Sequence, residues 1–245
     1  MICNAGKILQ GLIDVVFPPR CGTCGKVLAE GSGPYFCEAC RSDFDLCMSP
    51  LCPSCGIPYA DRSGTDHLCE RCLTSPPPYS ACRSVATYRG VLQEAIHRVK
   101  YGRDVTVGEM LGELMAECSD SLLNTDGYSM VLPVPLHTRK LRERGFNQSL
   151  LLSRPVARRR GLKLDYTVLK KKFHTEPQIS FGRTERTENL KGAFVVTDPL
   201  RIKGKKIVLI DDVFTTGSTV RECARALKKS GAEAVSVFTL CRTLN

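Results

Sequence analysis

The chain has 245 residues, of which 42% are hydrophobic and 24% are charged, and it carries a formal net charge of +10. This length allows a sizeable hydrophobic core and two unequal domains, and the composition excludes a collagen-like or largely disordered chain. No apolar run approaches the ~20 residues of a membrane-spanning helix, and the chain shows no export signal, so we expect no membrane span and a cytoplasmic location.

The charge is divided unevenly along the chain. Residues 1–80 contain six Lys and Arg against eight Asp and Glu, a balance of −2, whereas residues 81–245 contain 29 against 17, a balance of +12. The basic excess favours an anionic ligand, such as a polyphosphate or a nucleic acid, in the second part. We therefore predict two domains, 1–80 and 81–245, joined by the stiff Pro-rich segment 74–79. A short amphipathic helix is expected at 8–16.

The first domain is dominated by cysteine pairs. Eight cysteines form four C-x-x-C motifs: Cys21/Cys24, Cys37/Cys40, Cys52/Cys55 and Cys69/Cys72. Two such motifs can hold one tetrahedral Zn²⁺, so four predict two structural Cys₄ sites. Twelve residues separate the first two motifs and thirteen the last two, which indicates a duplicated zinc ribbon.

The spacing does not decide which two motifs share one zinc ion. Pairing in order along the chain is favoured over interleaved pairing, but both fit. Disulfides are disfavoured because no export signal is present, and redox chemistry is disfavoured because four evenly spaced motifs are not the usual pattern. Loss of zinc is expected to unfold the first domain and to leave ligand binding by the second intact.

Strands and helices alternate through the second domain. Strands are expected at 83–88, 130–135, 164–169, 193–196, 207–210 and 234–240, and helices at 91–99, 107–118, 149–159 and 220–229. This alternation predicts an α/β fold with a Rossmann-like, mainly parallel sheet. The polar segment 170–191 shows no clear periodicity and is predicted to be a long loop.

A cationic loop is predicted directly after the strand at 130–135. Its four cations are Arg139, Lys140, Arg142 and Arg144. Guanidinium groups suit phosphate oxygens, so we expect this loop to bind an anion. The long loop carries two further arginines, Arg183 and Arg186, and loops of that length are often functional.

The segment 207–229 is the most informative part of the chain. An apolar strand leads into Asp211 and Asp212, a loop of hydroxyl-bearing residues and glycine follows, and a helix begins at once. The first amides of a helix lack internal partners and carry partial positive charge, so the loop 215–219 is predicted to bind a phosphate group. Two carboxylates beside a phosphate would repel the ligand unless they bind sugar hydroxyls or a divalent cation. The combination predicts a ribose 5-phosphate site.

This segment resembles the phosphoribosyl pyrophosphate (PRPP) motif of type I phosphoribosyltransferases, in which an apolar strand and an acidic pair precede Thr-Thr-Gly-Ser-Thr. The resemblance implies that Asp211 and Asp212 bind the ribose hydroxyls, that the loop binds the 5′-phosphate, and that Mg²⁺ accompanies PRPP. It makes the cationic loop the pyrophosphate-binding loop, and it places Arg183 and Arg186 in a hood that closes over the ligand and excludes water. The PRPP-binding residues implied are Asp211, Asp212, Val213, Phe214, Thr215, Thr216, Gly217, Ser218 and Thr219, and the catalytic ones are Asp211, Asp212, Arg183 and Arg186.

The order of motifs along the whole chain resembles that of the competence protein F (ComF, ComFC) family. Phe-Pro-Pro is followed by the cysteine motifs, Leu-Pro-Val-Pro, Arg-Glu-Arg-Gly-Phe-Asn-Gln and the PRPP motif. Members join an amino-terminal zinc ribbon to a phosphoribosyltransferase domain. The resemblance implies a role in natural transformation, with single-stranded DNA and a competence helicase as partners.

Two classes of function are open at this point: an enzyme that acts on PRPP, and a non-catalytic nucleic-acid or protein adaptor on the same fold. No motif for selecting a nucleobase is recognisable, so no acceptor is predicted. The lack of Trp disfavours a stacking surface for bases. If nucleic acid binds, the arginines at 158–160 and the lysines at 170–172 are the expected contacts, outside the sugar-phosphate site.

Overall fold

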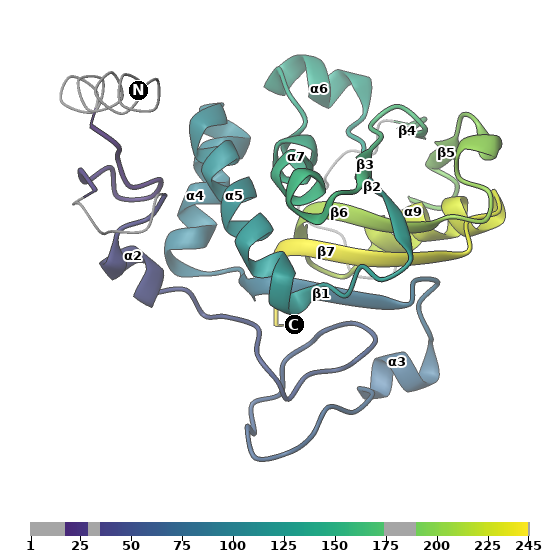
Figure 1. Ribbon diagram of the computed structural model, residues 1–245, viewed down its shortest axis with the longest axis horizontal. Coiled ribbons are helices and arrows are strands. Elements are labelled where there is room, and N and C mark those ends of the chain that lie inside the picture. Colours follow the sequence, from purple (N-terminus) through teal and green to yellow (C-terminus); the bar gives the residue numbers. More distant parts are fainter. Residues whose placement is uncertain (1–17, 29–34, 174–189, 245) are drawn as a thin grey trace, which may run out of the picture.

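A five-stranded, all-parallel sheet forms the centre of the protein, in the strand order β1-β7-β6-β2-β3 (Figure 1). The computed structural model describes residues 18–28, 35–173 and 190–244. The strands of the central sheet are β1 (Ala81–Thr87), β2 (Tyr128–Pro133), β3 (Lys163–Leu164), β6 (Lys206–Phe214) and β7 (Ala234–Arg242). Strands β4 (Leu169–Lys171) and β5 (Phe194–Val196) form a separate antiparallel pair. The predicted α/β fold with a mainly parallel sheet is confirmed.

Helices cover both faces of the sheet. On one face lie α4 (Gly90–Gly102), α5 (Val105–Leu122) and α7 (Gln148–Arg160), and on the other lies α9 (Ser218–Lys229). The shorter helices are α2 (Glu38–Ser42) and α3 (Glu70–Thr74) in the cysteine-rich segments and α6 (Thr138–Arg144) after β2, with a 3₁₀ turn, η1 (Pro199–Arg201). Alternate residues of β6 point to opposite cores: Val208 and Ile210 join the core beneath α4, α5 and α7, whereas Ile207 and Leu209 join the core beneath α9. Burial on both faces explains why this strand is apolar without alternation.

Two predicted elements differ from the observed ones in the second domain. The strand expected at 164–169 is two strands, because the buried carboxylate of Asp165 turns the chain by accepting hydrogen bonds from the amides of Thr167 and Val168. The cationic segment after β2 is the helix α6 rather than a loop. His137 accepts a hydrogen bond from the Arg139 amide at its start, and Gly145, with φ of 86°, ends it.

Strand β6 also runs beyond its predicted end at 210. Strand β7 continues to Arg242 and pairs with β6 as far as Phe214, so both carboxylates belong to the sheet. They are therefore held by backbone pairing on a rigid strand rather than in a turn.

The two cysteine-rich segments repeat one backbone pattern. In each, a glycine with positive φ (Gly25, 71°; Gly56, 73°) donates its amide to the carbonyl of the leading cysteine, Cys21 or Cys52. The second motif of each segment opens a short helix, α2 or α3. Positive φ is accessible to glycine without strain, which explains the glycine directly after each leading motif.

The cysteine-rich segments are joined to the sheet by backbone hydrogen bonds. The amide of Cys82 on β1 donates to the Ser54 carbonyl at 2.7 Å, and the amide of Thr87 donates to the Asp45 carbonyl at 2.8 Å. The outer edge of β1 is thus paired, which protects it from pairing with other chains. Among the helices that the structure describes, none has the length and apolar character needed to cross a bilayer. The helix predicted at 8–16 lies outside the described residues.

Candidate functional site

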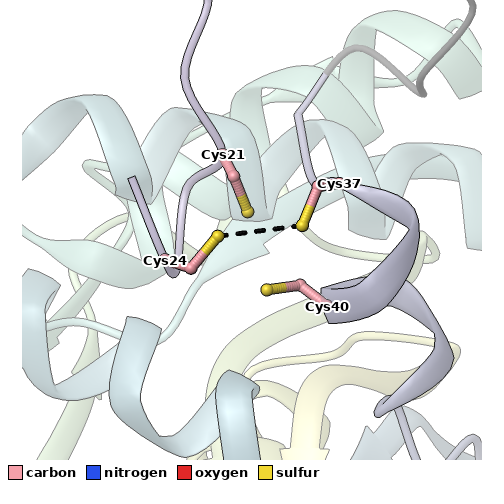
Figure 2. A group of neighbouring side chains, drawn as sticks. All are labelled: Cys21, Cys24, Cys37 and Cys40. Atoms are coloured by element: carbon pink, nitrogen blue, oxygen red, sulfur yellow. Dashed lines mark hydrogen bonds between the residues drawn. The ribbon is translucent and has the colours of Figure 1, made fainter. Parts of the chain in front are cut away.

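Two clusters of four cysteines lie in the amino-terminal part. Figure 2 shows the sulfur atoms of the first cluster, which converge on a common centre. The clusters are Cys21, Cys24, Cys37 and Cys40, and Cys52, Cys55, Cys69 and Cys72, with the sulfur atoms of each within 4.8 Å of one another. Cys24 and Cys37 are 3.7 Å apart between sulfurs, as are Cys55 and Cys69. The predicted pairing in order along the chain is confirmed.

Each leading cysteine is surrounded by amide donors. Burial alone would raise the pKa of Cys52, but hydrogen bonds from backbone amides, including those of Cys55 and Cys69 at 3.5 Å, lower it to about 7. The same balance lowers the pKa of Cys21 to about 6. A thiolate is the form that binds metal, so the lowered pKa of each leading cysteine and the convergence of four thiols in each cluster fit a tetrahedral, structural Zn²⁺.

The acid pair lies at the carboxyl end of β6 and is nearly enclosed. Asp211 is 9% exposed and Asp212 is 7% exposed. The hydroxyl of Ser149 donates to Oδ1 of Asp211 at 3.0 Å, and Nζ of Lys100 lies 2.6 Å from Oδ2 of Asp212. Each carboxylate therefore has a partner that orients it.

Burial and mutual repulsion control the protonation of the pair. Burial, followed by the neighbouring charge of Asp212, raises the pKa of Asp211 to about 7. Burial alone would lower the pKa of Lys100, but the charge of Asp212 raises it above its usual value. Lys100 therefore stays protonated, and Asp211 can donate as well as accept hydrogen bonds near neutral pH.

The loop after β6 has the features of a phosphate site. Gly217, with φ of 75°, is the N-cap of α9, and the first turn of α9 has no acidic side chain. The hydroxyls of Thr216 and Ser218 lie 2.9 Å apart. An added Cβ on Gly217 would lie 2.4 Å from the ring of Phe214, so this ring packs directly against the loop. Hydroxyls, the backbone amides at the start of α9 and the dipole of this helix suit a phosphate group.

The four cations of α6 divide between two faces. Arg139 and Arg142 are exposed, whereas Lys140 and Arg144, one turn apart, are partly buried. Burial, and then the charge of Arg144, lowers the pKa of Lys140, and the charge of Lys100 acts in the same direction. Helix α6 follows the carboxyl end of β2, which runs parallel to β6, so its partly buried cations Lys140 and Arg144 lie toward the edge of the sheet that carries the acid pair.

Comparison with known proteins identifies both parts of the chain. Residues 12–73 match the double zinc ribbon domain, and residues 147–244 match the phosphoribosyl transferase domain. DNA utilization protein YhgH of Escherichia coli (strain K12) is 36% identical over 235 residues, which cover 93% of this chain and 98% of the relative. Competence protein ComFC of Bacillus subtilis (strain 168) is 30% identical over 216 residues, 84% of each chain. Competence protein F of Haemophilus influenzae is 27% identical and covers 85% of this chain and 97% of the relative.

This chain belongs to the competence protein F family. The family and the fold that were expected from its motifs are both confirmed, as is the double zinc ribbon. The match to the phosphoribosyl transferase domain begins at Asn147, so it contains the acid pair, the phosphate loop and α9 but not Lys100 or α6.

Two residues of the site were not predicted from the sequence. Lys100 lies near the end of α4, where lysine is common because it complements the helix dipole, so nothing in the pattern distinguishes it. Ser149 lies in the first turn of α7, directly beside its N-cap region, and serine is frequent there. Both come from helices far from the acid pair in the sequence.

Three further cations were predicted to contact a ligand or nucleic acid: Arg183, Arg186 and Lys171. Arg183 and Arg186 lie outside the described residues, and their place in a hood stays a prediction. Lys171, on β4, was predicted to contact nucleic acid away from the sugar-phosphate site. Burial, and then the charge of Lys140, lowers its pKa, and its Nζ lies over the ring of Phe194, 5.6 Å from the centroid. Its contact with nucleic acid stays a prediction.

The arginine run at the end of α7 is engaged with α5. Arg158 pairs with Glu113 at 2.5 Å. Asp120 pairs with Arg159 at 2.5 Å and with Arg160 at 3.1 Å. These ion pairs neutralise part of the run, so the structure gives little support to a DNA contact there.

Protein purified without chelator should contain two zinc ions per chain by mass spectrometry. Cys24→Ser and Cys55→Ser should each remove about one ion, because three thiolates hold Zn²⁺ less tightly than four. Cys118→Ser, which alters a cysteine outside both clusters, is the control and should retain two. A wild-type protein without zinc would contradict the assignment.

The raised pKa of Asp211 predicts a pH-dependent cost to stability. Because the pKa rises from 3.8 to about 7 on folding, the protonated form stabilises the fold, and this advantage disappears as pH rises from 4 through 7. The free energy of unfolding of the wild type, minus that of Asp211→Asn, should fall by up to roughly 1.4 kcal/mol per pH unit in this window. Urea titrations at several pH values measure it. Glu109→Gln, at an exposed position, serves as the control; parallel curves for the wild type and Asp211→Asn would refute the assignment.

Proposed function

We propose that the carboxyl edge of the sheet binds PRPP or ribose 5-phosphate, and that the protein transfers the phosphoribosyl group of PRPP to an acceptor. The observation that carries this proposal is the buried pair Asp211 and Asp212, placed directly before a loop and helix that suit phosphate. Carboxylates oriented by Lys100 and Ser149 are suited to neutral sugar hydroxyls. The cations Lys140 and Arg144 of α6, the helix that follows the carboxyl end of β2 beside β6, support a polyphosphate ligand.

In this proposal each group has one role. Amides and hydroxyls of 215–219 bind the 5′-phosphate, the acid pair binds the 2′- and 3′-hydroxyls, and Lys140 and Arg144 bind the pyrophosphate. During transfer the bond between C1′ and pyrophosphate oxygen breaks, and its electron pair leaves with the pyrophosphate. An acceptor supplies the electron pair of the new bond to C1′ and gives its proton to the released pyrophosphate. The negative field of Asp211 and Asp212 stabilises positive charge that develops on the sugar, and the cations of α6 stabilise the leaving group.

Mg²⁺ belongs to this proposal as the ion that accompanies PRPP. It prefers oxygen ligands and commonly binds through phosphates with one or two carboxylates. Because Lys100 already pairs with Oδ2 of Asp212, an ion on that oxygen would have to displace Lys100. The arrangement therefore fits Mg²⁺ that is held mainly by ligand oxygens; when bound, the ion neutralises the charge of the pyrophosphate.

The biological role is proposed from the relatives. Their names refer to DNA utilization and competence, which supports a role in natural transformation and the uptake of single-stranded DNA. We place the protein in the cytoplasm, with single-stranded DNA and a competence helicase as partners. Its zinc ribbon domain corresponds to 1–80 and its phosphoribosyltransferase-like domain to 81–245.

Replacing Gly217 with Ala should weaken binding of PRPP at least about tenfold. The added Cβ would meet the Phe214 ring at 2.4 Å, and alanine is disfavoured at φ of 75°, so the loop must shift. Isothermal titration calorimetry with PRPP and Mg²⁺ measures the affinity.

Gly161→Ala is the matched control for this experiment. Gly161 also has positive φ (63°), but it ends α7 and has open space where a Cβ would be added. Both variants should lose roughly 1–2 kcal/mol of stability from the strained backbone, but only Gly217→Ala should lose affinity. Equal affinities for the two variants would contradict the assigned phosphate site.

A further inference from the structure

A side chain of the second zinc ribbon contacts the backbone of the phosphate loop directly. Arg71 lies on α3, directly before the cluster residue Cys72, and its Nη2 donates to the carbonyl of Thr216 at 2.7 Å. Thr216 belongs to the loop that is proposed to bind the 5′-phosphate. A side chain adjacent to a metal ligand therefore holds the backbone of the ligand-binding loop.

A second series of contacts connects the second cysteine cluster to the same loop through the buried side chains of Arg242 and Phe214. Nη1 of Arg242 donates to the carbonyl of Cys55 at 2.7 Å, and Arg242 is only 3% exposed. Its guanidinium lies over the ring of Phe214, 5.2 Å from the centroid. That ring supports Gly217, so contacts run without a break from Cys55 in the second cluster to the N-cap of α9.

The first zinc ribbon is attached elsewhere. Nη1 of Arg98 on α4 donates to the carbonyls of Gly22 and Thr23 at 3.0 and 2.9 Å, and Arg41 on α2 pairs with Glu117 on α5 at 3.3 Å. In Figure 1, α2 lies near α4 and α5, whereas α3 lies apart from them, below β1. The two ribbons therefore contact different parts of the sheet domain.

The sequences of the two ribbons differ at the position of Arg71. Each short helix begins after a cluster cysteine, Cys37 in α2 or Cys69 in α3. Two residues later the first ribbon has Ala39 and the second has Arg71. The residue that reaches the phosphate loop is thus specific to the second copy of the repeat.

We propose that Arg71 and Arg242 are positioning residues through which the second zinc ribbon holds the phosphate loop in its binding conformation. Loss of zinc from the second cluster then lowers affinity for the phosphate ligand, whereas loss of zinc from the first does not. The reason is that the metal fixes Cys55 and α3 relative to each other, and both contacts start from these elements. If the Cys55 carbonyl moves away, the buried guanidinium of Arg242 loses its acceptor and must shift to find another. Because this guanidinium lies over Phe214, the shift also moves the ring that supports the loop.

The sequence led us to expect that zinc loss leaves ligand binding intact, whereas this proposal expects weaker binding. The expected loss of affinity rests on the proposed PRPP site. A measurement without ligand tests the hold on the loop separately from the identity of the ligand. Amide hydrogen exchange, followed by mass spectrometry in peptides that cover 213–219, reports how firmly the loop is held whether or not PRPP is the ligand.

The test compares matched variants of the full chain. Arg71→Met removes the guanidinium, with Arg41→Met as its control in the first ribbon. Cys69→Ser removes one ligand of the second cluster, with Cys37→Ser at the equivalent position of the first. Zinc content and circular dichroism establish that each cysteine variant has lost one ion and is folded.

In Arg71→Met and Cys69→Ser, we expect the amide hydrogens of the loop to exchange about tenfold faster than in the wild type. Both variants should also bind PRPP with Mg²⁺ about tenfold more weakly. Arg41→Met and Cys37→Ser should match the wild type in both. If Cys69→Ser fails to fold, Arg71→Met still decides the matter. Loop exchange in Arg71→Met equal to that of Arg41→Met would overturn the inference, whereas faster exchange in a protein that binds no PRPP would overturn the proposed ligand alone.

Discussion

Two adjacent carboxylates on a central strand are the constraint around which the site is arranged. Burying charge is costly unless it is paired and hydrogen-bonded, and each carboxylate of the pair is less than one tenth exposed. Lys100 pairs with Asp212, Ser149 donates to Asp211, and the two partners come from helices α4 and α7 on one face of the sheet. The packing of these helices is therefore a condition for the charge at the end of β6 to be tolerated.

The same constraint makes the site rigid before any ligand arrives. Pairing with β7 extends β6 through both carboxylates, and the loop that follows rests on the buried ring of Phe214. Groups that are already oriented need little rearrangement to bind sugar hydroxyls and phosphate. The zinc ribbons add to this rigidity because arginines of the sheet domain, Arg98 and Arg242, donate to backbone carbonyls within them.

Local patterns account for what could be predicted from the sequence. The cysteine spacing predicts two clusters of four without fixing which motifs pair, and the run from Asp211 to the start of α9 identifies the strand, loop and helix, because each depends on residues close together in the chain. Lys100 could not be predicted, because its role comes from a tertiary contact that no periodicity records. The cationic segment was predicted to be a loop, whereas capping by His137 at its start and by Gly145 at its end makes it a short helix. The strand predicted at 164–169 failed because a buried aspartate bonds to its own backbone.

The most direct test of the account is turnover of radiolabelled PRPP with Mg²⁺ and a panel of bases, nucleotides and oligonucleotides. The account predicts acceptor-dependent release of pyrophosphate by the wild type, and its loss in the Asp211→Asn, Asp212→Asn double variant, whose side chains no longer stabilise positive charge on the sugar. Binding of PRPP by the wild type without release of pyrophosphate, across the whole panel, would contradict phosphoribosyl transfer and indicate a non-catalytic adaptor that uses the same fold.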